Sequence, residues 1–314
     1  MLDRRFAATL VAVATLMLVA CGTTGRPPTA SPIGSPVGYP GWPPNVRLEL
    51  IPVPVSTEIV VGQNRFLMNL IDATNTPLVS ADRPVQLRFF DLAEDPATAK
   101  TETPGIYTPL VEGRPGLYRA AVNFDSAGDW GVEVETTEPN GGHRTGRTVF
   151  SVRDSGTTPA IGDLAIAVDT PTATTPAEIA RISTDDHPDP DFYRLTITEA
   201  VDADKPFLLA FATPAFCQTQ TCGPALDVVK SVATDYKDRV NFLHVEPYEL
   251  KEVDGNLQPE LSADNLPVPV PAVEEWGLPT EPYIFVVDES GAVTAKFEGV
   301  AGADELRAAL EAVS

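Results

Sequence analysis

Residues 207–225 read FLLAFATPAFCQTQTCGPA, an apolar run followed by a polar loop and two cysteines. The run 207–212 has the length and composition of a buried strand. Beyond the second cysteine, apolar residues recur at spacings of three and four between Leu226 and Tyr236, which predicts a helix that starts near Gly223. The stretch therefore predicts a strand, a cysteine-bearing loop and a helix in direct succession.

Further apolar runs at 240–245 (VNFLHV) and 283–287 (YIFVV) predict two more buried strands. A turn joins the second of them to a strand at 293–298, and the apolar spacing over 304–313 predicts a last helix. Continuous apolar runs that alternate with helical patterns are typical of parallel βαβ units. We therefore expect an α/β domain over residues 181–314.

The order of these elements, the stretch FATPAFCQTQTCGPALDVV and the tripeptide Thr280-Glu281-Pro282 resemble the thioredoxin superfamily, most of all its extracytoplasmic members. The resemblance covers roughly residues 160–314 and implies an α/β thioredoxin-like fold. It also implies a cis Glu281–Pro282 peptide bond, with Pro282 facing the active-site sulfur.

The cysteine spacing departs from the usual CGPC or CxxC site of that superfamily, because four residues separate Cys217 from Cys222. The pair is either an expanded CxxC, or Cys222-Gly223-Pro224-Ala225 aligns with CGPC. The second alignment is favoured, since it places Pro224 in the first helical turn, where its missing N–H is tolerated. In that alignment Cys222, at a helix N-terminus, is the expected nucleophile, and Cys217 is the resolving thiol that could form a disulfide with it.

Many thioredoxins hold a buried acid on the strand that leads to the cysteines, and the strand FLLAFA has none. His244 is the nearest substitute, and Glu246 points to the same face of its strand by alternation. His244 is thus a candidate proton shuttle for the cysteines, although a half-buried histidine bonded to its surroundings is the commoner case.

Two other interpretations of the cysteine pair stay open. Cys217 and Cys222 could form a structural disulfide in a non-catalytic binding or scaffold protein. Together with His244 they could instead bind copper, since thiolates and imidazole suit that metal. No cofactor is expected, and a zinc site is disfavoured because only two sulfurs are at hand.

The first 22 residues, MLDRRFAATLVAVATLMLVACG, have a charged start and a short apolar run that ends in small residues before Cys21. They resemble the signal peptide and lipobox of bacterial lipoproteins. The resemblance implies cleavage after residue 20, lipid on Cys21 and a chain held on the extracytoplasmic side of the cell membrane. An uncleaved signal anchor is the alternative, and it also leaves the rest of the chain outside the cytoplasm. Residues 21–45 are rich in Pro, Gly, Ser and Thr, as in an extended tether.

Residues 46–152 show short alternating or β-branched runs between turn clusters. Seven strands are expected, at 46–51, 58–61, 64–71, 85–90, 116–124, 129–135 and 147–152. Trp130 alternates with Val132 and Val134 and is therefore expected in the core. The pattern resembles bacterial immunoglobulin-like domains and implies an all-β sandwich of two sheets, followed by a linker at 153–180. The expected chain is thus two-domain, an immunoglobulin-like sandwich followed by the thioredoxin-like fold.

Charge restricts the partners of this protein. With 22 basic against 44 acidic residues, the 314-residue chain has a formal charge of −22, which argues against nucleic-acid binding. An extracytoplasmic protein thiol or disulfide is the expected partner, and membrane contact is expected only through the lipid on Cys21. Neither the redox partner nor the direction of electron flow follows from the residues.

Overall fold

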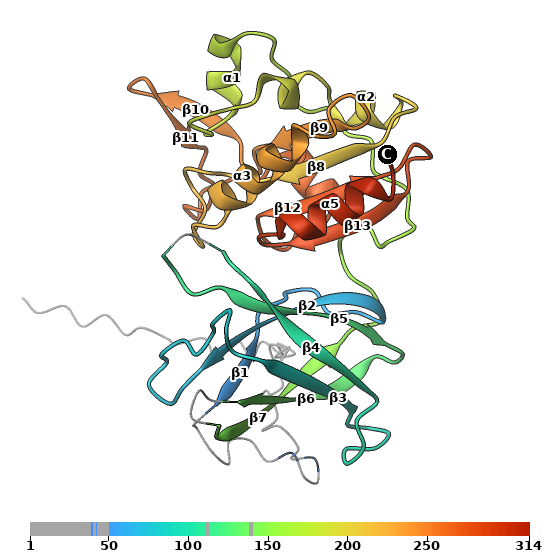
Figure 1. Cartoon of the computed structure of the whole chain (residues 1–314). Coiled ribbons are helices and arrows are strands. Elements are labelled where there is room, and N and C mark those ends of the chain that lie inside the picture. Colours follow the sequence, from blue (N-terminus) through green and yellow to red (C-terminus); the bar gives the residue numbers. More distant parts are fainter. Residues whose placement is uncertain (1–38, 40–41, 43–49, 111–112, 138–140) are drawn as a thin grey trace, which may run out of the picture. The chain divides into compact units, whose positions relative to one another are not determined.

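Strands predominate in the computed structural model, which describes residues 39, 42, 50–110, 113–137 and 141–314. Among these residues thirteen strands stand against five α-helices and one 3-10 helix (Figure 1). The predicted signal peptide, Cys21 and nearly all of the predicted tether lie outside the described residues. Within the described part, no helix has the length and apolar character that crossing a membrane requires.

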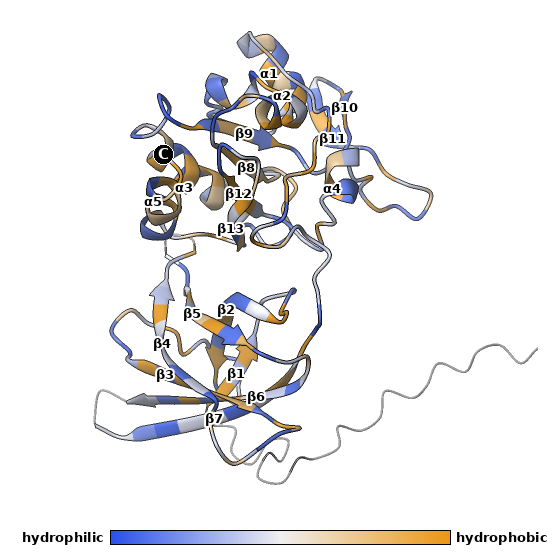
Figure 2. Cartoon of the chain, turned by 90° about the vertical axis from the view of Figure 1, so that its right-hand side faces the viewer, coloured by the Kyte–Doolittle hydropathy of each residue, from blue (hydrophilic) through white to orange (hydrophobic). Residues whose placement is uncertain are grey.

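Seven antiparallel strands form the larger sheet, with the order β1-β2-β5-β4-β3-β6-β7. Hydrophobic and hydrophilic residues are interspersed along these strands (Figure 2). Their bounds are β1 Ile51–Pro54, β2 Gly62–Ile71, β3 Val85–Asp91, β4 Thr101–Thr108, β5 Leu117–Phe124, β6 Gly128–Thr137 and β7 His143–Val152.

The sheet is continuous because β4 pairs on both sides. Its first half, 101–105, pairs with β3, and its second half, 106–108, pairs with β5. The two edge strands also approach each other, since Gly146 of β7 lies so close to Leu50 that a β-carbon there would meet the Leu50 carbonyl oxygen. The sheet is therefore a nearly closed, barrel-like sheet, and the expected immunoglobulin-like sandwich of two separate sheets is wrong.

The sandwich is expected from the sequence because the sequence does not predict strand β4. β4 reads TETPGIYT, and its Pro104 and Gly105 are typical of a turn. A strand was expected instead at 58–61, where only Val60 forms an isolated bridge, to Arg153. Without β4 the remaining strands divide into two groups, which is the pattern of a sandwich.

The interior of the larger sheet is aromatic. Phe66, Phe89 and Phe124 pack edge to face, and Trp130 packs against Phe124 with ring centroids 4.8 Å apart. Trp130 is 1% exposed, which confirms its expected place in the core. Its Nε1 donates to the Ser126 carbonyl oxygen at 3.1 Å, so the polar atom of this buried ring is satisfied.

A smaller sheet of four strands lies in the C-terminal part, with the order β13-β12-β8-β9. Its strands are β8 Phe207–Phe211, β9 Asn241–Val245, β12 Tyr283–Val287 and β13 Val293–Glu298. The other elements of this part are α1 Pro176–Ile182, η1 Pro190–Tyr193, α2 Ile197–Val201, α3 Cys222–Ala233, β10 Leu250–Val253, β11 Asn256–Pro259, α4 Pro271–Glu275 and α5 Ala303–Glu311.

The second half of the expected fold class is also wrong. Only β8 and β9 run parallel, whereas β12 is antiparallel to both of its neighbours. The run YIFVV of β12 is buried throughout, and burial on both faces rather than parallel pairing explains its continuous apolar sequence. Residues 38–314 moreover form one compact unit. The described chain is a mostly β protein and not a two-domain protein with an α/β thioredoxin-like half.

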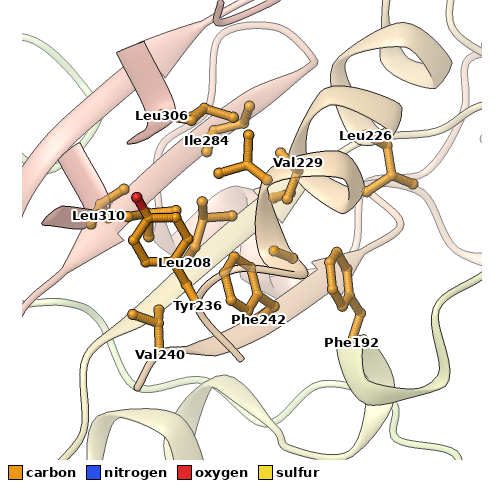
Figure 3. Packing of buried hydrophobic residues seen from close by; sticks show 14 of the residues in the cluster. Phe192, Leu208, Leu226, Val229, Tyr236, Val240, Phe242, Ile284, Leu306 and Leu310 are labelled. Atoms are coloured by element: carbon orange, nitrogen blue, oxygen red, sulfur yellow. The ribbon is translucent and has the colours of Figure 1, made fainter. Parts of the chain in front are cut away.

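Helices α3 and α5 pack on one face of the smaller sheet (Figure 3). Leu226 and Val229 of α3 and Leu306 and Leu310 of α5 point into the same cluster, and all four are at most 1% exposed. These are apolar positions that the helical spacing predicts. The packing anchors α3 by its buried stripe, and therefore holds its N-terminal residue, Cys222, at a set place beside the end of β8.

Candidate functional site

The cysteine loop connects the end of β8 with the start of α3. The Cys217 amide donates to the Thr213 carbonyl oxygen at 3.1 Å, and the Gln220 amide donates to the Cys217 carbonyl oxygen at 3.1 Å. Gln220 has a φ of 59°, in the left-handed region, which turns the chain back toward the helix. These two turns bring Cys217 beside the first residue of α3.

The two cysteines form a close pair of free thiols. The Cys222 amide donates to the Cys217 sulfur at 3.3 Å, and the Thr219 hydroxyl lies 3.2 Å from the same sulfur. Cys217 is partly exposed, whereas Cys222 is 0% exposed. An incoming molecule can therefore reach Cys217 first, with Cys222 behind it.

Hydrogen bonding acidifies Cys217. The pKa of Cys217 is lowered to about 4, and the largest cause is the Cys222 side chain, which donates to the Cys217 sulfur. Burial opposes this shift. The Thr219 hydroxyl and the amides of Thr221 and Cys222 lower the pKa further. The pKa of Cys222 is raised, first by the same hydrogen bond to Cys217 and then by burial. Near neutral pH the pair thus consists of a Cys217 thiolate and a Cys222 thiol.

The exposure and the pKa values of the two sulfurs favour Cys217 as the nucleophile and Cys222 as the resolving thiol, which reverses the roles that the sequence suggested. Cys222 does stand at the N-terminus of α3, as expected, but its own sulfur is buried under the loop. Cys217 precedes the helix, but its sulfur accepts a hydrogen bond from the first amide of the helix and is the accessible one of the two. The reason is the fold of the loop, which carries Cys217 back over the helix start.

Pro282 and Glu281 lie at the same edge of the smaller sheet as the cysteine loop. The Glu281–Pro282 peptide bond is cis, as the resemblance implied. Tyr283 pairs with Phe211 in an antiparallel register, so Pro282, which precedes β12, and the cysteine loop, which follows β8, emerge at the same end of the two strands. The Thr213 amide faces the Cys222 sulfur, where it lowers the pKa of that thiol.

Glu281 and Tyr248 are the site residues that sequence reasoning missed. Each of them interacts electrostatically with the other and with Cys217. Burial is the largest cause that raises the pKa of each, and the negative charge of Glu281 adds to it for Tyr248. The only signal in the sequence was the place of Glu281 directly before Pro282; Tyr248, 33 residues away, carried none.

His244 is engaged elsewhere. Its Nε2 lies 2.9 Å from the Ala212 carbonyl oxygen, which can only accept, so Nε2 carries a hydrogen. The Tyr193 hydroxyl occupies Nδ1 at 2.8 Å and is itself 2.9 Å from the Ser183 hydroxyl. Both ring nitrogens therefore have protein partners. The hydrogen bond to Ala212 ties the histidine to the end of β8, and neither nitrogen is bonded to a cysteine sulfur.

Glu246, the other candidate acid, is bonded to the segment that follows α1. One of its carboxylate oxygens accepts from the amide and the hydroxyl of Thr184, both at 2.6 Å. The residue is 6% exposed. Its role in the structure is to hold the segment after α1 against the end of β9.

The copper interpretation gains no support from this geometry. Among the described residues, no group of three or more His, Cys, Asp or Glu side chains lies close enough to hold a metal ion. Because His244 is engaged on both nitrogens, Cys217 and Cys222 have no third ligand there.

Comparisons with known proteins give no family. No protein-family model matches the chain, and no curated protein is significantly similar to it. Among solved structures, the PmoD soluble domain from Methylocystis sp. has 21% identity and a TM-score of 0.19, over 31% of this chain and 79% of that one. A putative glycoside hydrolase from Bacteroides vulgatus has 14% identity and a TM-score of 0.22, over 67% of this chain and 36% of that one. Scores this low carry no argument about fold or function.

Proposed function

We propose that this protein exchanges thiols and disulfides with a partner, with Cys217 as the attacking sulfur and Cys222 as the resolving one. The observation that carries the proposal is the arrangement of the pair. The sulfur of the partly exposed, acidified Cys217 accepts a hydrogen bond from the Cys222 amide, and the buried Cys222 thiol lies behind it. An accessible thiolate beside a second thiol is what exchange through a mixed disulfide requires.

The reaction transfers two electrons. The Cys217 thiolate attacks one sulfur of the partner disulfide, a new S–S bond forms, and the other partner sulfur leaves with the electron pair of the broken bond. Cys222 then loses its proton and attacks Cys217, which releases the second partner sulfur. The partner becomes a dithiol, and the Cys217–Cys222 disulfide is formed. Run backwards, the same steps oxidise a partner dithiol.

The proposed setting is the extracytoplasmic side of the cell membrane, with the chain held by lipid on Cys21. The charged and apolar pattern of residues 1–20 and the small residues before Cys21 support it. The partner is then a protein thiol or disulfide of that compartment, where disulfides persist.

The test uses the full-length chain in a Cys21→Ser background, so that only the pair carries thiols. Reduced Cys222→Ser is mixed with oxidised glutathione, and intact mass is recorded. We expect a lasting mixed disulfide on Cys217, since no resolving thiol remains, and much slower adduct formation by Cys217→Ser. A Cys217→Ser variant that forms adduct as fast as Cys222→Ser would contradict the assigned order.

The reduction potential separates exchange from a structural disulfide in a scaffold protein. A potential between roughly −120 and −270 mV is expected for an exchanging pair, whereas a value well below about −300 mV indicates a structural bond. The measurement uses the same Cys21→Ser chain in glutathione or dithiothreitol buffers. A potential in the lower range would overturn the proposed function.

A further inference from the structure

We propose that Thr184, held by Glu246, positions the cysteine loop for thiol exchange. Its hydroxyl binds the Ala215 amide and thereby keeps the Cys217 sulfur at the first amide of α3. The inference rests on the proposed function and adds a positioning residue to it. It starts from a requirement of the site: Cys217 lies in a loop, five positions before the helix amide that it accepts, so its place depends on what holds the loop.

The Thr184 hydroxyl connects two segments that are far apart in the sequence. It lies 2.6 Å from a Glu246 carboxylate oxygen, which accepts its one hydrogen. Its oxygen can therefore act as an acceptor, and the Ala215 amide donates to it at 3.2 Å. The Thr184 amide donates to the same Glu246 oxygen at 2.6 Å. Thr184 thus ties the cysteine loop to the buried carboxylate at the end of β9.

Ala215 lies inside the turn that carries Cys217. The amides of Phe216 and Cys217 both donate to the Thr213 carbonyl oxygen, at 3.3 and 3.1 Å. Ala215 stands in the middle of this turn and is exposed. The hydrogen bond to Thr184 therefore holds the middle of the turn to a segment outside the loop.

The residue before Thr184 reaches the other side of the same turn. The Ser183 hydroxyl lies 2.9 Å from the Tyr193 hydroxyl, which is 2.8 Å from His244 Nδ1. His244 Nε2 in turn donates to the Ala212 carbonyl oxygen at 2.9 Å. The two neighbours therefore hold the cysteine loop on both sides of its first turn.

The segment that carries Thr184 is itself anchored to α3. Lys230 Nζ donates to both carboxylate oxygens of Asp185, at 3.0 and 2.8 Å, and to the His187 carbonyl oxygen at 3.1 Å. The side chains of Asp185 and Lys230 are only 9% and 16% exposed, so water screens this ion pair less than a surface pair. The support for the loop is thus fixed at both α3 and β9.

A substitution at Thr184 separates the position of the Cys217 sulfur from the charges around it. The titratable groups that interact with this sulfur are Cys222 of α3, Glu281 before β12 and Tyr248 after β9. Thr184→Val removes a neutral hydroxyl and changes none of these groups. A change in the pKa of Cys217 would then report that its sulfur has moved away from the donors at the start of α3.

The test follows alkylation of the reduced Cys21→Ser chain by iodoacetamide, with the rate at Cys217 measured by mass spectrometry. We expect Thr184→Val to raise the pKa of Cys217 and so to lower the rate at pH 5 by about 2-fold or more, with no change at pH 8, where the thiolate stays complete. A loop that only became more accessible would change the rate at every pH.

Two further variants serve as controls. Thr184→Ser keeps the hydroxyl and should keep the parent pH profile. Thr174→Val removes a hydroxyl that also bonds a glutamate, Glu178 at 3.1 Å, but at an exposed place before α1. It should leave the profile unchanged.

Hydrogen exchange of the parent chain gives a test that needs no variant. Because Ala215 is exposed, its amide should be protected by its bond to Thr184, by about 10-fold or more relative to the unfolded chain. A parent-like pH profile in Thr184→Val, or an unprotected Ala215 amide, would overturn the inference. Failure of the parent chain to react with oxidised glutathione would instead refute the proposed exchange itself.

Discussion

The Cys222 amide donates its hydrogen bond to the Cys217 sulfur at 3.3 Å, at the point where α3 begins. Helix N-termini leave amides unpaired, and a side chain of the preceding residue often accepts from them. Here Thr221, the residue at the cap position, makes no such bond. A sulfur five positions upstream of the helix start does so instead, which ties the chemistry of Cys217 to the start of the helix.

Alkylation of Cys217 should be nearly independent of pH. Because the pKa of Cys217 is lowered to about 4, the thiolate is already formed above about pH 5, and the rate with iodoacetamide should stay level up to about pH 8. An ordinary thiol would gain about 10-fold per pH unit over this range. Mass spectrometry of quenched samples gives the rate at each sulfur, and Cys222 should stay unmodified until the protein unfolds.

The matched control for that measurement is Cys222→Ala. It keeps the amide donor and removes the thiol donor, which is the largest cause of the lowered pKa of Cys217. The alkylation rate near pH 6 should therefore fall. A parent rate that climbs about 10-fold per unit would show that the loop does not acidify Cys217.

The reduced protein should gain stability from Cys217 as pH rises. The pKa of this thiol is lowered in the folded chain relative to about 8.5 in the unfolded one, so its contribution is fully present above about pH 8.5 and lost as pH falls through about 4. Urea unfolding under a phosphine reductant, compared with Cys217→Ser at each pH, gives the contribution as a difference. A difference that does not change with pH would contradict the expectation.

Tyr193→Phe should destabilise the C-terminal part. The substitution removes the hydroxyl that bonds His244 Nδ1 at 2.8 Å and leaves that buried nitrogen without its partner. An unsatisfied buried polar group costs about 1–3 kcal/mol of the free energy of unfolding. Tyr236→Phe is the control, since its hydroxyl bonds Glu311 near the surface and its loss should be smaller. Equal effects in urea unfolding would argue against a special role for the buried network.

Gly146→Ala should strain the nearly closed sheet. A β-carbon at this position of β7 would meet the Leu50 carbonyl oxygen beside β1, and inserted atoms in close-packed places cost about 1–3 kcal/mol. Gly223→Ala in α3 is the control, because no atom lies within 4 Å of its β-carbon position. Thermal unfolding of both variants tests this, and a harmless Gly146→Ala would mean that the sheet edges are further apart.

Local patterns revealed most of the elements but not how they pair. The strand at 207–211, the helix after Cys222 and the core place of Trp130 all follow from short periodicities, and the structure confirms them. Pairing partners lie far along the chain, and an apolar run such as YIFVV looks the same in parallel and antiparallel surroundings. For that reason the direction of β12 and the continuity through β4 could not be foreseen.

The sequence by itself determined that two cysteines stand between a buried strand and a helix, and it marked Pro282 as a candidate neighbour. Only the tertiary structure decided which sulfur is accessible and acidified, that His244 is engaged elsewhere, and that Glu281 and Pro282 line one cavity with the cysteine loop. The physical reason is that hydrogen bonding, burial and charge act between atoms that the fold brings together. Sequence spacing records none of these contacts when the partners are tens of residues apart.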